Sequence, residues 1–177
     1  MLHPSRADWR DKGESLRPIR IKCGSAADAV RVASLRSRPY AFSMFYQRAE
    51  SPLRLNGLDA ARRFFANCLA ETDPNKEHLW VAHVDEQARC IHLSRHDGDV
   101  GAANLPLRDV ITDAATHGSA GLILAHNHPG GDPTPSADDR HLTRRLALAA
   151  EAIDLTLLDH LVIAGPECRS MRQMGLL

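Results

Sequence analysis

Three side chains that could bind a metal ion lie close together in the sequence: His126, His128 and Asp139. The two histidines follow the apolar run 121–125, which is typical of a short buried strand. Side chains two residues apart on a strand point to the same side, so the pair predicts two imidazoles that face one point. A catalytic divalent-metal site typically has three protein ligands and one position open for water, and Asp139 is the candidate third ligand. Asp138 would lie on a different face of the helix.

The loop between the histidines and Asp139 is rich in proline and glycine. Residues 129–135 contain three prolines and two glycines, which make a backbone stiff at some points and able to bend tightly at others. By themselves, Ser136 and Asp139 would predict only a helix N-cap. The same Ser-x-x-Asp spacing occurs at Ser25 and Asp28 with no histidine pair nearby. It is therefore the combination that predicts a functional metal site.

This spacing resembles the metal-binding signature of the JAMM (MPN) metallopeptidase superfamily, in which His-x-His is followed after seven residues by Ser-x-x-Asp. The string 126–136, His-Asn-His-Pro-Gly-Gly-Asp-Pro-Thr-Pro-Ser, and the segment 158–163, Leu-Asp-His-Leu-Val-Ile, are similar to the RadC-like branch. The resemblance covers roughly residues 56–177 but not the first 55, where longer RadC proteins carry a helix-hairpin-helix module. Gly130 stands where the family usually has serine, at a position that carries no ligand.

The resemblance implies an α/β fold with JAMM/MPN (cytidine-deaminase-like) architecture and a zinc-dependent hydrolase of peptide or isopeptide bonds. The Zn²⁺ ion would be held by His126, His128 and Asp139, and it would lower the pKa of a water from about 16 to roughly 7. Ser136 would donate a hydrogen bond to the developing oxyanion, a contribution typically of about 3 kcal/mol. The expected partner is a peptide or protein-conjugate substrate.

A hydrolase of this kind also needs a carboxylate that takes up a proton, and the chain offers few. No glutamate occurs between Glu86, expected in a hairpin turn, and Glu151, expected at the far end of a helix. Glu77 precedes the first strand, where the JAMM resemblance implies a catalytic glutamate. We therefore predict that Glu77 is the general base. The competing interpretation is a solvated carboxylate beside Lys76.

Apolar periodicity predicts three helices and four strands in the order α-β-β-α-β-α-β, and hence a mixed β-sheet with packed helices. The expected helices begin near residues 59, 106 and 136, and the expected strands span 78–84, 89–95, 121–125 and 157–164. The first two strands form a hairpin, and the Gly-Pro pair 165–166 ends the last strand. The predicted buried helix faces are Ala61, Phe64, Phe65, Cys68 and Leu69; Val110, Ile111, Ala114 and Ala115; and Leu142, Leu146, Ala149 and Ile153.

The remaining histidines are weaker ligand candidates. His83 and His92 could pair across the hairpin, and we expect them at the sheet surface. His141 is expected to be exposed. His160, next to Asp159, is expected to form a buried polar pair with it in the core or beside the metal ligands.

Residues 1–55 differ from the rest of the chain in charge. They carry 11 Lys/Arg against 5 Asp/Glu, whereas residues 56–177 carry 11 against 17. We expect a basic N-terminal extension, residues 1–55, partly helical or irregular, and a RadC-like JAMM/MPN domain, residues 56–177. Docking of the extension on the acidic domain is favoured over contact with nucleic acid. The aromatic segment 39–52 is expected to pack on the domain or across a homodimer interface.

The cysteines and apolar segments favour a cytoplasmic protein. Cys23, Cys68, Cys90 and Cys168 show no close spacing, which is typical of reduced, buried thiols. No apolar run approaches the length of a membrane span, and the N-terminus lacks the apolar core of a signal peptide. We therefore expect no membrane partner.

Two alternatives to a hydrolase stay open. One is a DNA-repair-associated role, as a nucleic-acid-binding protein or a metal-dependent nuclease, because RadC-like proteins carry a DNA-repair label. The other is a non-catalytic MPN scaffold. Scaffolds of this superfamily usually lose the metal ligands, which this chain keeps, so ligand retention favours the enzyme.

The nucleic-acid alternative makes its own prediction through charge. If residues 1–55 bind phosphates, DNA affinity falls by roughly one power of ten per tenfold rise in salt for each phosphate contacted, and deleting these residues abolishes it. We expect weak or absent binding near physiological salt, measured by fluorescence anisotropy with labelled duplex DNA. Tight, salt-sensitive binding that needs residues 1–55 would favour the DNA-associated role instead.

Overall fold

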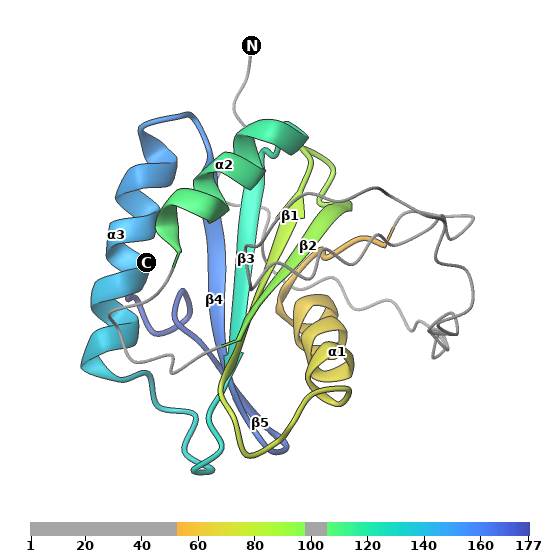
Figure 1. Ribbon diagram of the computed structural model, residues 1–177, viewed down its shortest axis with the longest axis vertical. Helices are drawn as coiled ribbons and strands as arrows, with labels where there is room; N and C mark the ends of the chain where they lie inside the picture. The colour runs from red at the N-terminus through yellow and green to blue at the C-terminus, as the bar shows by residue number, and fades with distance from the viewer. Residues whose placement is uncertain (1–52, 98–105) are drawn as a thin grey trace, which may run out of the picture.

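The computed structural model of the chain describes residues 53–97 and 106–177, in eight elements (Figure 1). Their bounds are Leu58–Leu69 (α1), His78–Val84 (β1), Cys90–Asp97 (β2), Leu107–His117 (α2), Gly121–Asn127 (β3), Ala137–Glu151 (α3), Thr156–Ala164 (β4) and Glu167–Ser170 (β5). The second Ser-x-x-Asp helix cap, at Ser25 and Asp28, and the aromatic segment 39–52 lie outside the described residues.

The five strands form one mixed sheet in the order β2-β1-β3-β4-β5. β1 pairs antiparallel with β2 and β3, β3 pairs parallel with β4, and β5 pairs antiparallel with β4. The pairing of β3 with β4 contains a β-bulge, because Leu122 lies opposite Leu157 whereas Ile123 lies opposite Asp159. The predicted α/β class and mixed β-sheet with packed helices, of JAMM/MPN (cytidine-deaminase-like) architecture, are confirmed.

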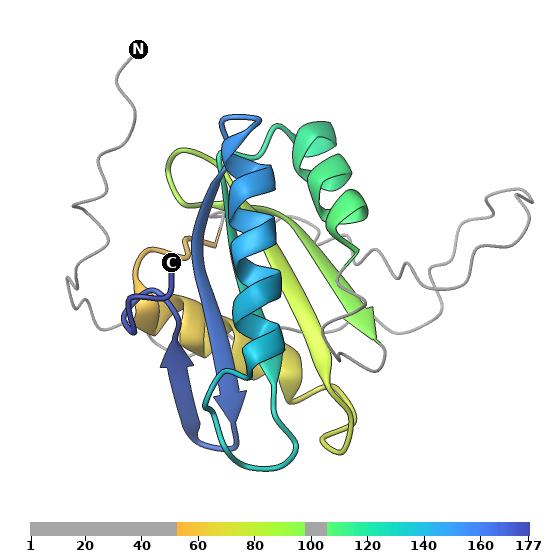
Figure 2. The same ribbon diagram turned by 90° about the vertical axis from the view of Figure 1, so that its left-hand side faces the viewer.

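Helices cover both faces of the sheet, α1 on one and α2 with α3 on the other (Figures 1 and 2). Each face has its own apolar cluster, and the side chains of each strand alternate between the two. The α1 cluster includes Phe64, Phe65, Trp80, Ile123 and Leu161. The α2–α3 cluster includes Leu79, Val81, Leu122, Leu124, Leu142 and Leu146. Among the described residues, no helix is long and apolar enough to cross a bilayer.

The sequence did not reveal β5. Gly165 adopts a positive φ of 56° and, with Pro166, ends β4 as predicted, but it also turns the chain back so that Glu167–Ser170 pairs with β4. This edge strand is short, polar and mostly exposed, so it has no apolar run that would predict it.

Three residues of the predicted helix faces are not core residues. Ala115 is exposed because it lies off the face of α2 that carries the buried Val110 and Ala114. Ala149 is half-buried, and Ala150 takes the core position. Ile153 is 46% exposed because α3 ends at Glu151 and the following turn carries the side chain outward.

Gly118 ends α2 in the left-handed conformation, with φ 62° and ψ 42°. This geometry lets the backbone N–H of Ser119 donate to the carbonyl of Ala114 at 2.9 Å. A Cβ added at residue 118 would meet nothing within 4 Å, so a substitution there costs backbone strain alone. We expect Gly118→Ala to lower the free energy of unfolding by about 1–2 kcal/mol in denaturant titrations.

Two further variants control for this effect. Gly118→Asn should lose less, because asparagine tolerates the left-handed region. Gly130→Ala should be close to neutral, since Gly130 has neither a positive φ nor an atom within 4 Å of an added Cβ. Equal losses at the two glycines would contradict the explanation.

Candidate metal centre

The sheet brings the three predicted ligands together at the end of β3. The Nε2 atoms of His126 and His128 lie 2.9 Å apart, and the Asp139 carboxylate oxygens lie 3.5 Å from the first and 3.6 Å from the second. Two ligands of a tetrahedral zinc ion, each about 2.0–2.1 Å from the metal, are about 3.3 Å apart. The three distances therefore fit a single divalent ion. Among the described residues, His126, His128 and Asp139 form one of two groups of side chains that could hold a metal ion.

Asp139 is held in place by the start of α3. Ser136 is the N-cap, and its hydroxyl accepts from the backbone N–H of Asp139 at 3.0 Å, while the backbone N–H of Ser136 donates to the Asp139 carboxylate at 2.7 Å. Burial raises the pKa of Asp139, but the neighbouring His126 and the hydrogen bonds from Ser136 outweigh it and hold the pKa below its ordinary value. The group is therefore a carboxylate at neutral pH, as a metal ligand must be.

The tautomer of His126 follows from a buried chain of hydrogen bonds. The Thr143 hydroxyl donates to the backbone carbonyl of Asp139 at 2.5 Å and so accepts from Nδ1–H of His160 at 2.7 Å. Burial, followed by the charge of His126, lowers the pKa of His160 well below its ordinary value, so its Nε2 is an acceptor. His126 then donates its Nδ1–H to that atom at 2.8 Å and presents the lone pair of its own Nε2 to the site.

His128 is oriented in the same way by a different group. Its Nδ1–H donates to the backbone carbonyl of Asp132 at 2.7 Å, which leaves its Nε2 lone pair toward His126. Two lone pairs 2.9 Å apart repel each other unless a proton or a cation lies between them. The donor set of two neutral imidazoles and one carboxylate is one that Zn²⁺ favours.

The hydroxyl of Thr143 is expected to strengthen metal binding, although Thr143 does not face the ion. Without its hydroxyl, His160 can carry its proton on Nε2, which would force the His126 proton onto the nitrogen that faces the metal. We expect Thr143→Val to weaken zinc binding by about 10–100-fold, measured by competition with a chromophoric chelator. Thr143→Ser keeps the hydroxyl and should restore affinity. An unchanged affinity in Thr143→Val would contradict this role.

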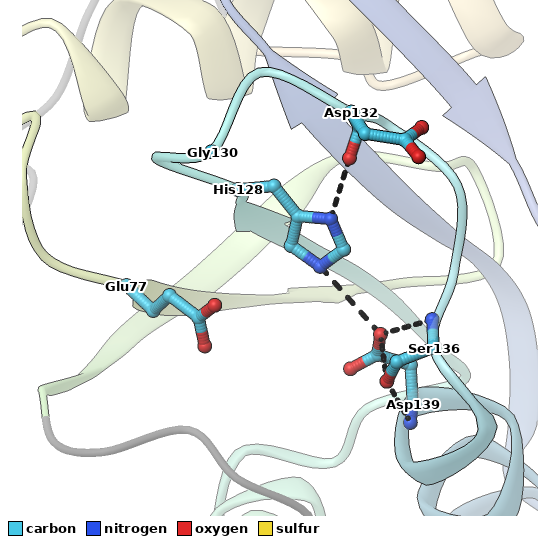
Figure 3. A pocket seen from close by; sticks show the side chains of 6 residues that line it. All are labelled: Glu77, His128, Gly130, Asp132, Ser136 and Asp139. Carbon is cyan, nitrogen blue, oxygen red and sulfur yellow. Dashed lines mark hydrogen bonds and ion pairs between the residues drawn. The ribbon is translucent and has the colours of Figure 1, made fainter.

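Glu77 lies on the rim of the same open pocket, and its carboxylate points into it (Figure 3). The pocket is lined by Glu77, His128, Gly130, Asp132, Ser136 and Asp139. The Asn127 side chain fixes the backbone on both sides of Glu77, because it donates to the Lys76 carbonyl at 2.8 Å and accepts from the His78 N–H at 2.8 Å. The middle residue of His-Asn-His therefore positions the candidate base.

Ser136 also lines the pocket, but its hydroxyl proton is already used. The Oγ atom donates to the Asp139 carboxylate at 2.6 Å (Figure 3). A hydrogen bond from this group to a substrate oxygen would require the hydroxyl to rotate away from Asp139. Asp138 is exposed one position away, as expected, and His141 is exposed too.

Asp159 and His160 are both buried, but they do not form the expected side-chain pair. The Asp159 carboxylate accepts from the Ser170 hydroxyl at 2.5 Å and from the backbone N–H of Arg172 at 3.1 Å, whereas His160 points to His126. The reason is that consecutive residues of a strand face opposite sides of the sheet, and the bulge before Asp159 sets which of the two faces His126.

His83 and His92 do lie opposite each other across the β1–β2 hairpin. The expectation that both lie at the sheet surface is wrong for His83, which is fully buried, because α2 covers this part of the sheet. His92 is half-buried.

Sequence reasoning missed two residues that position the centre, Thr143 and Asn127. Thr143 reads as an ordinary helical residue, and Asn127 reads as a spacer between two histidines. A signal was present for Asn127, because a polar residue at the end of a buried strand must find a hydrogen-bond partner.

The chain is similar to known proteins. A family model described as the RadC-like JAB domain matches residues 55–176. A UPF0758 protein of Bordetella petrii is 38% identical over 121 residues, which cover 67% of this chain and 52% of that protein. A UPF0758 protein of Chloroflexus aurantiacus is 35% identical over 103 residues, 58% of this chain and 45% of that one.

A shorter match reaches higher identity. A UPF0758 protein of Neisseria meningitidis serogroup C is 44% identical over 85 residues, 48% of this chain and 37% of that protein. The chain thus spans about half or less of the length of the relatives it matches. The family match includes every predicted ligand, Glu77 and Ser136. The chain belongs to the RadC-like JAB domain family, within the JAMM/MPN superfamily.

Proposed function

We propose that the chain is a zinc-dependent hydrolase of peptide or isopeptide bonds. The observation that supports this most is the convergence of two imidazole lone pairs and one carboxylate on a point beside an open pocket. A non-catalytic scaffold needs neither oriented lone pairs nor a carboxylate on the rim. The names of the relatives state no activity, and support for the proposed reaction comes from this site alone.

Five residues have a part in the proposed reaction. His126, His128 and Asp139 would hold a zinc ion, which would supply acidification of a water and polarisation of the scissile carbonyl. Glu77 would take a proton from the attacking water on a carboxylate oxygen as the water oxygen bonds to the carbonyl carbon, and would pass that proton to the leaving amine as its bond to this carbon breaks. Ser136, after its hydroxyl rotates, donates to the carbonyl oxygen as negative charge develops there.

The surroundings keep these groups in place. The rigid loop 129–135 provides the backbone carbonyl that orients His128, and the start of α3 orients Asp139. Burial raises the pKa of the Cys90 thiol to about 12 and that of Cys168 to about 11, so both are uncharged thiols at neutral pH. We place the activity in the cytoplasm, where such thiols stay reduced.

The test is hydrolysis by the zinc-loaded full chain. Linear peptide libraries and peptides joined through a lysine side chain would be incubated with the protein, and new termini would be detected by mass spectrometry. We expect cleavage that stops on chelation and returns with zinc. A protein that binds stoichiometric zinc but cleaves neither kind of library would favour the scaffold interpretation.

A further inference from the structure

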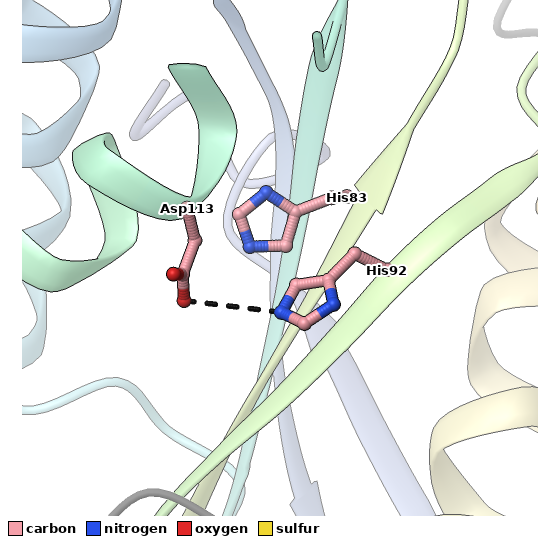
Figure 4. A group of neighbouring side chains, drawn as sticks. All are labelled: His83, His92 and Asp113. Carbon is pink, nitrogen blue, oxygen red and sulfur yellow. Dashed lines mark ion pairs between the residues drawn. The ribbon is translucent and has the colours of Figure 1, made fainter. Parts of the chain in front are cut away.

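A second group of metal-competent side chains lies at the other end of β1. His83 of β1, His92 of β2 and Asp113 of α2 each offer one ligand atom, and these atoms lie within 4.8 Å of one another (Figure 4). The His92 Nε2 atom lies 3.8 Å from the nearer Asp113 carboxylate oxygen. The group faces the same side of the sheet as His126, which pairs with Leu79, four residues before His83. The two groups are therefore about 13 Å apart along the strand.

One ring nitrogen of His83 has no hydrogen-bond partner in the described part of the chain. The side chain is fully buried, and its Nδ1 atom lies 3.2 Å from the Ser119 hydroxyl oxygen. Its Nε2 atom is buried and has no hydrogen-bond partner among residues 53–97 and 106–177. Buried polar atoms are nearly always satisfied, so an orphan imidazole nitrogen beside a second imidazole and a carboxylate indicates a missing ligand.

The surroundings of His83 keep its imidazole ring neutral. Burial, and next the neighbouring His92, His117 and His96, lower the pKa of His83 to about 3. Burial and His117 also lower the pKa of His92, although Asp113 opposes this. Both rings are thus neutral at physiological pH, the state that binds a transition metal. The proton of His83 can sit on Nδ1 and be donated to Ser119, which leaves the Nε2 lone pair for an ion.

A third imidazole covers one face of the His92 ring. His117 stacks on it, with ring centroids 3.9 Å apart and an interplanar angle of 10°. His117 itself donates from Nδ1 to the backbone carbonyl of Asp113 at 2.8 Å. This stack and this bond connect His92 of β2 to α2, the helix that carries Asp113.

We propose that His83, His92 and Asp113 form a second site for a divalent transition-metal ion of the zinc type. Two imidazoles and one carboxylate favour Zn²⁺, Fe²⁺, Co²⁺ or Ni²⁺ over Mg²⁺ or Ca²⁺. The ligand atoms are farther apart than the 3.3 Å or so of a tetrahedral site, and rotation of the partly exposed His92 and Asp113 would close the difference. A bound ion would be held by side chains of β1, β2 and α2, so it would stabilise the packing of the helix against the hairpin.

The test counts zinc equivalents in the untagged full chain. The proteins, dialysed after loading, would be compared by mass spectrometry of the metal. We expect two equivalents in the unchanged chain and one in the His126→Ala/His128→Ala protein. We expect one in His92→Ala/Asp113→Asn and none in the chain that carries all four substitutions. Asp113→Asn keeps the size of the side chain, and circular dichroism would check that each variant is folded.

Further readouts separate this site from the first. Zinc should raise the melting temperature of the His126→Ala/His128→Ala protein, and Asp113→Asn in that background should remove the increase. His141→Ala, which changes an exposed histidine of α3, should keep both equivalents. The proposal is overturned if the His126→Ala/His128→Ala protein binds no zinc, or if its zinc persists when His92 and Asp113 are also replaced. Neither result depends on whether the protein hydrolyses anything.

Discussion

Replacing His126 and His128 together by alanine is expected to remove one equivalent of zinc and to reduce hydrolysis to the uncatalysed background, with the fold intact. Two of the three ligands are lost, and Asp139 alone cannot hold the ion. The two apolar clusters on the sheet do not depend on the metal, so the domain should remain folded without it, unlike a small zinc finger. Metal analysis, circular dichroism and a peptide-cleavage assay measure the three effects.

His141→Ala is the matched control for this variant, because it removes an exposed imidazole from α3. It should leave zinc content and turnover unchanged. A His126→Ala/His128→Ala protein that keeps as much zinc as the unchanged chain would sink the assignment of the centre.

Glu77→Gln is expected to keep the zinc and the fold but to lose two or more powers of ten in turnover. Glutamine has the size of glutamate and can still occupy the pocket rim, but it cannot accept the proton of the attacking water. Because the change affects a proton transfer and not substrate contacts, the loss should appear in kcat and not in KM.

Glu86→Gln removes an exposed glutamate from the β1–β2 turn and controls for the loss of one negative charge. It should have full activity. Wild-type turnover in Glu77→Gln would show that another group handles the proton, and Glu77 would then be the solvated carboxylate of the competing interpretation.

The grouping of His126, His128 and Asp139 could be predicted from the sequence because local geometry decides it. His126 and His128 obey the period of a strand, and Ser136 with Asp139 obeys the geometry of a helix N-cap. No part of that argument requires knowledge of which strands are neighbours. The same holds for the helices and the apolar strands, whose periods are local properties of the chain.

The groups that orient those ligands depend on pairing between distant segments, which the sequence does not reveal. The bulge opposite Leu122 and Ile123 decides whether Asp159 or His160 faces the centre, and strand period alone cannot locate a bulge. The burial of His83 depends likewise on the position of α2. Residues 1–52 lie outside the described part of the chain, so the expectations for the extension stay predictions.

The hydrogen bonds of Asn127 bear on any attempt to transplant this centre. His126 and His128 of the tripeptide 126–128 face the candidate metal centre. The side chain of the middle residue, Asn127, forms hydrogen bonds with the backbone of Lys76 and His78 instead. A designer who grafts the histidines and Asp139 onto another scaffold would obtain an ion without a reliably placed base. The smallest portable unit is therefore β1, β3, the part of α3 from its start to Thr143, and His160 of β4, with the asparagine setting the separation between ion and glutamate.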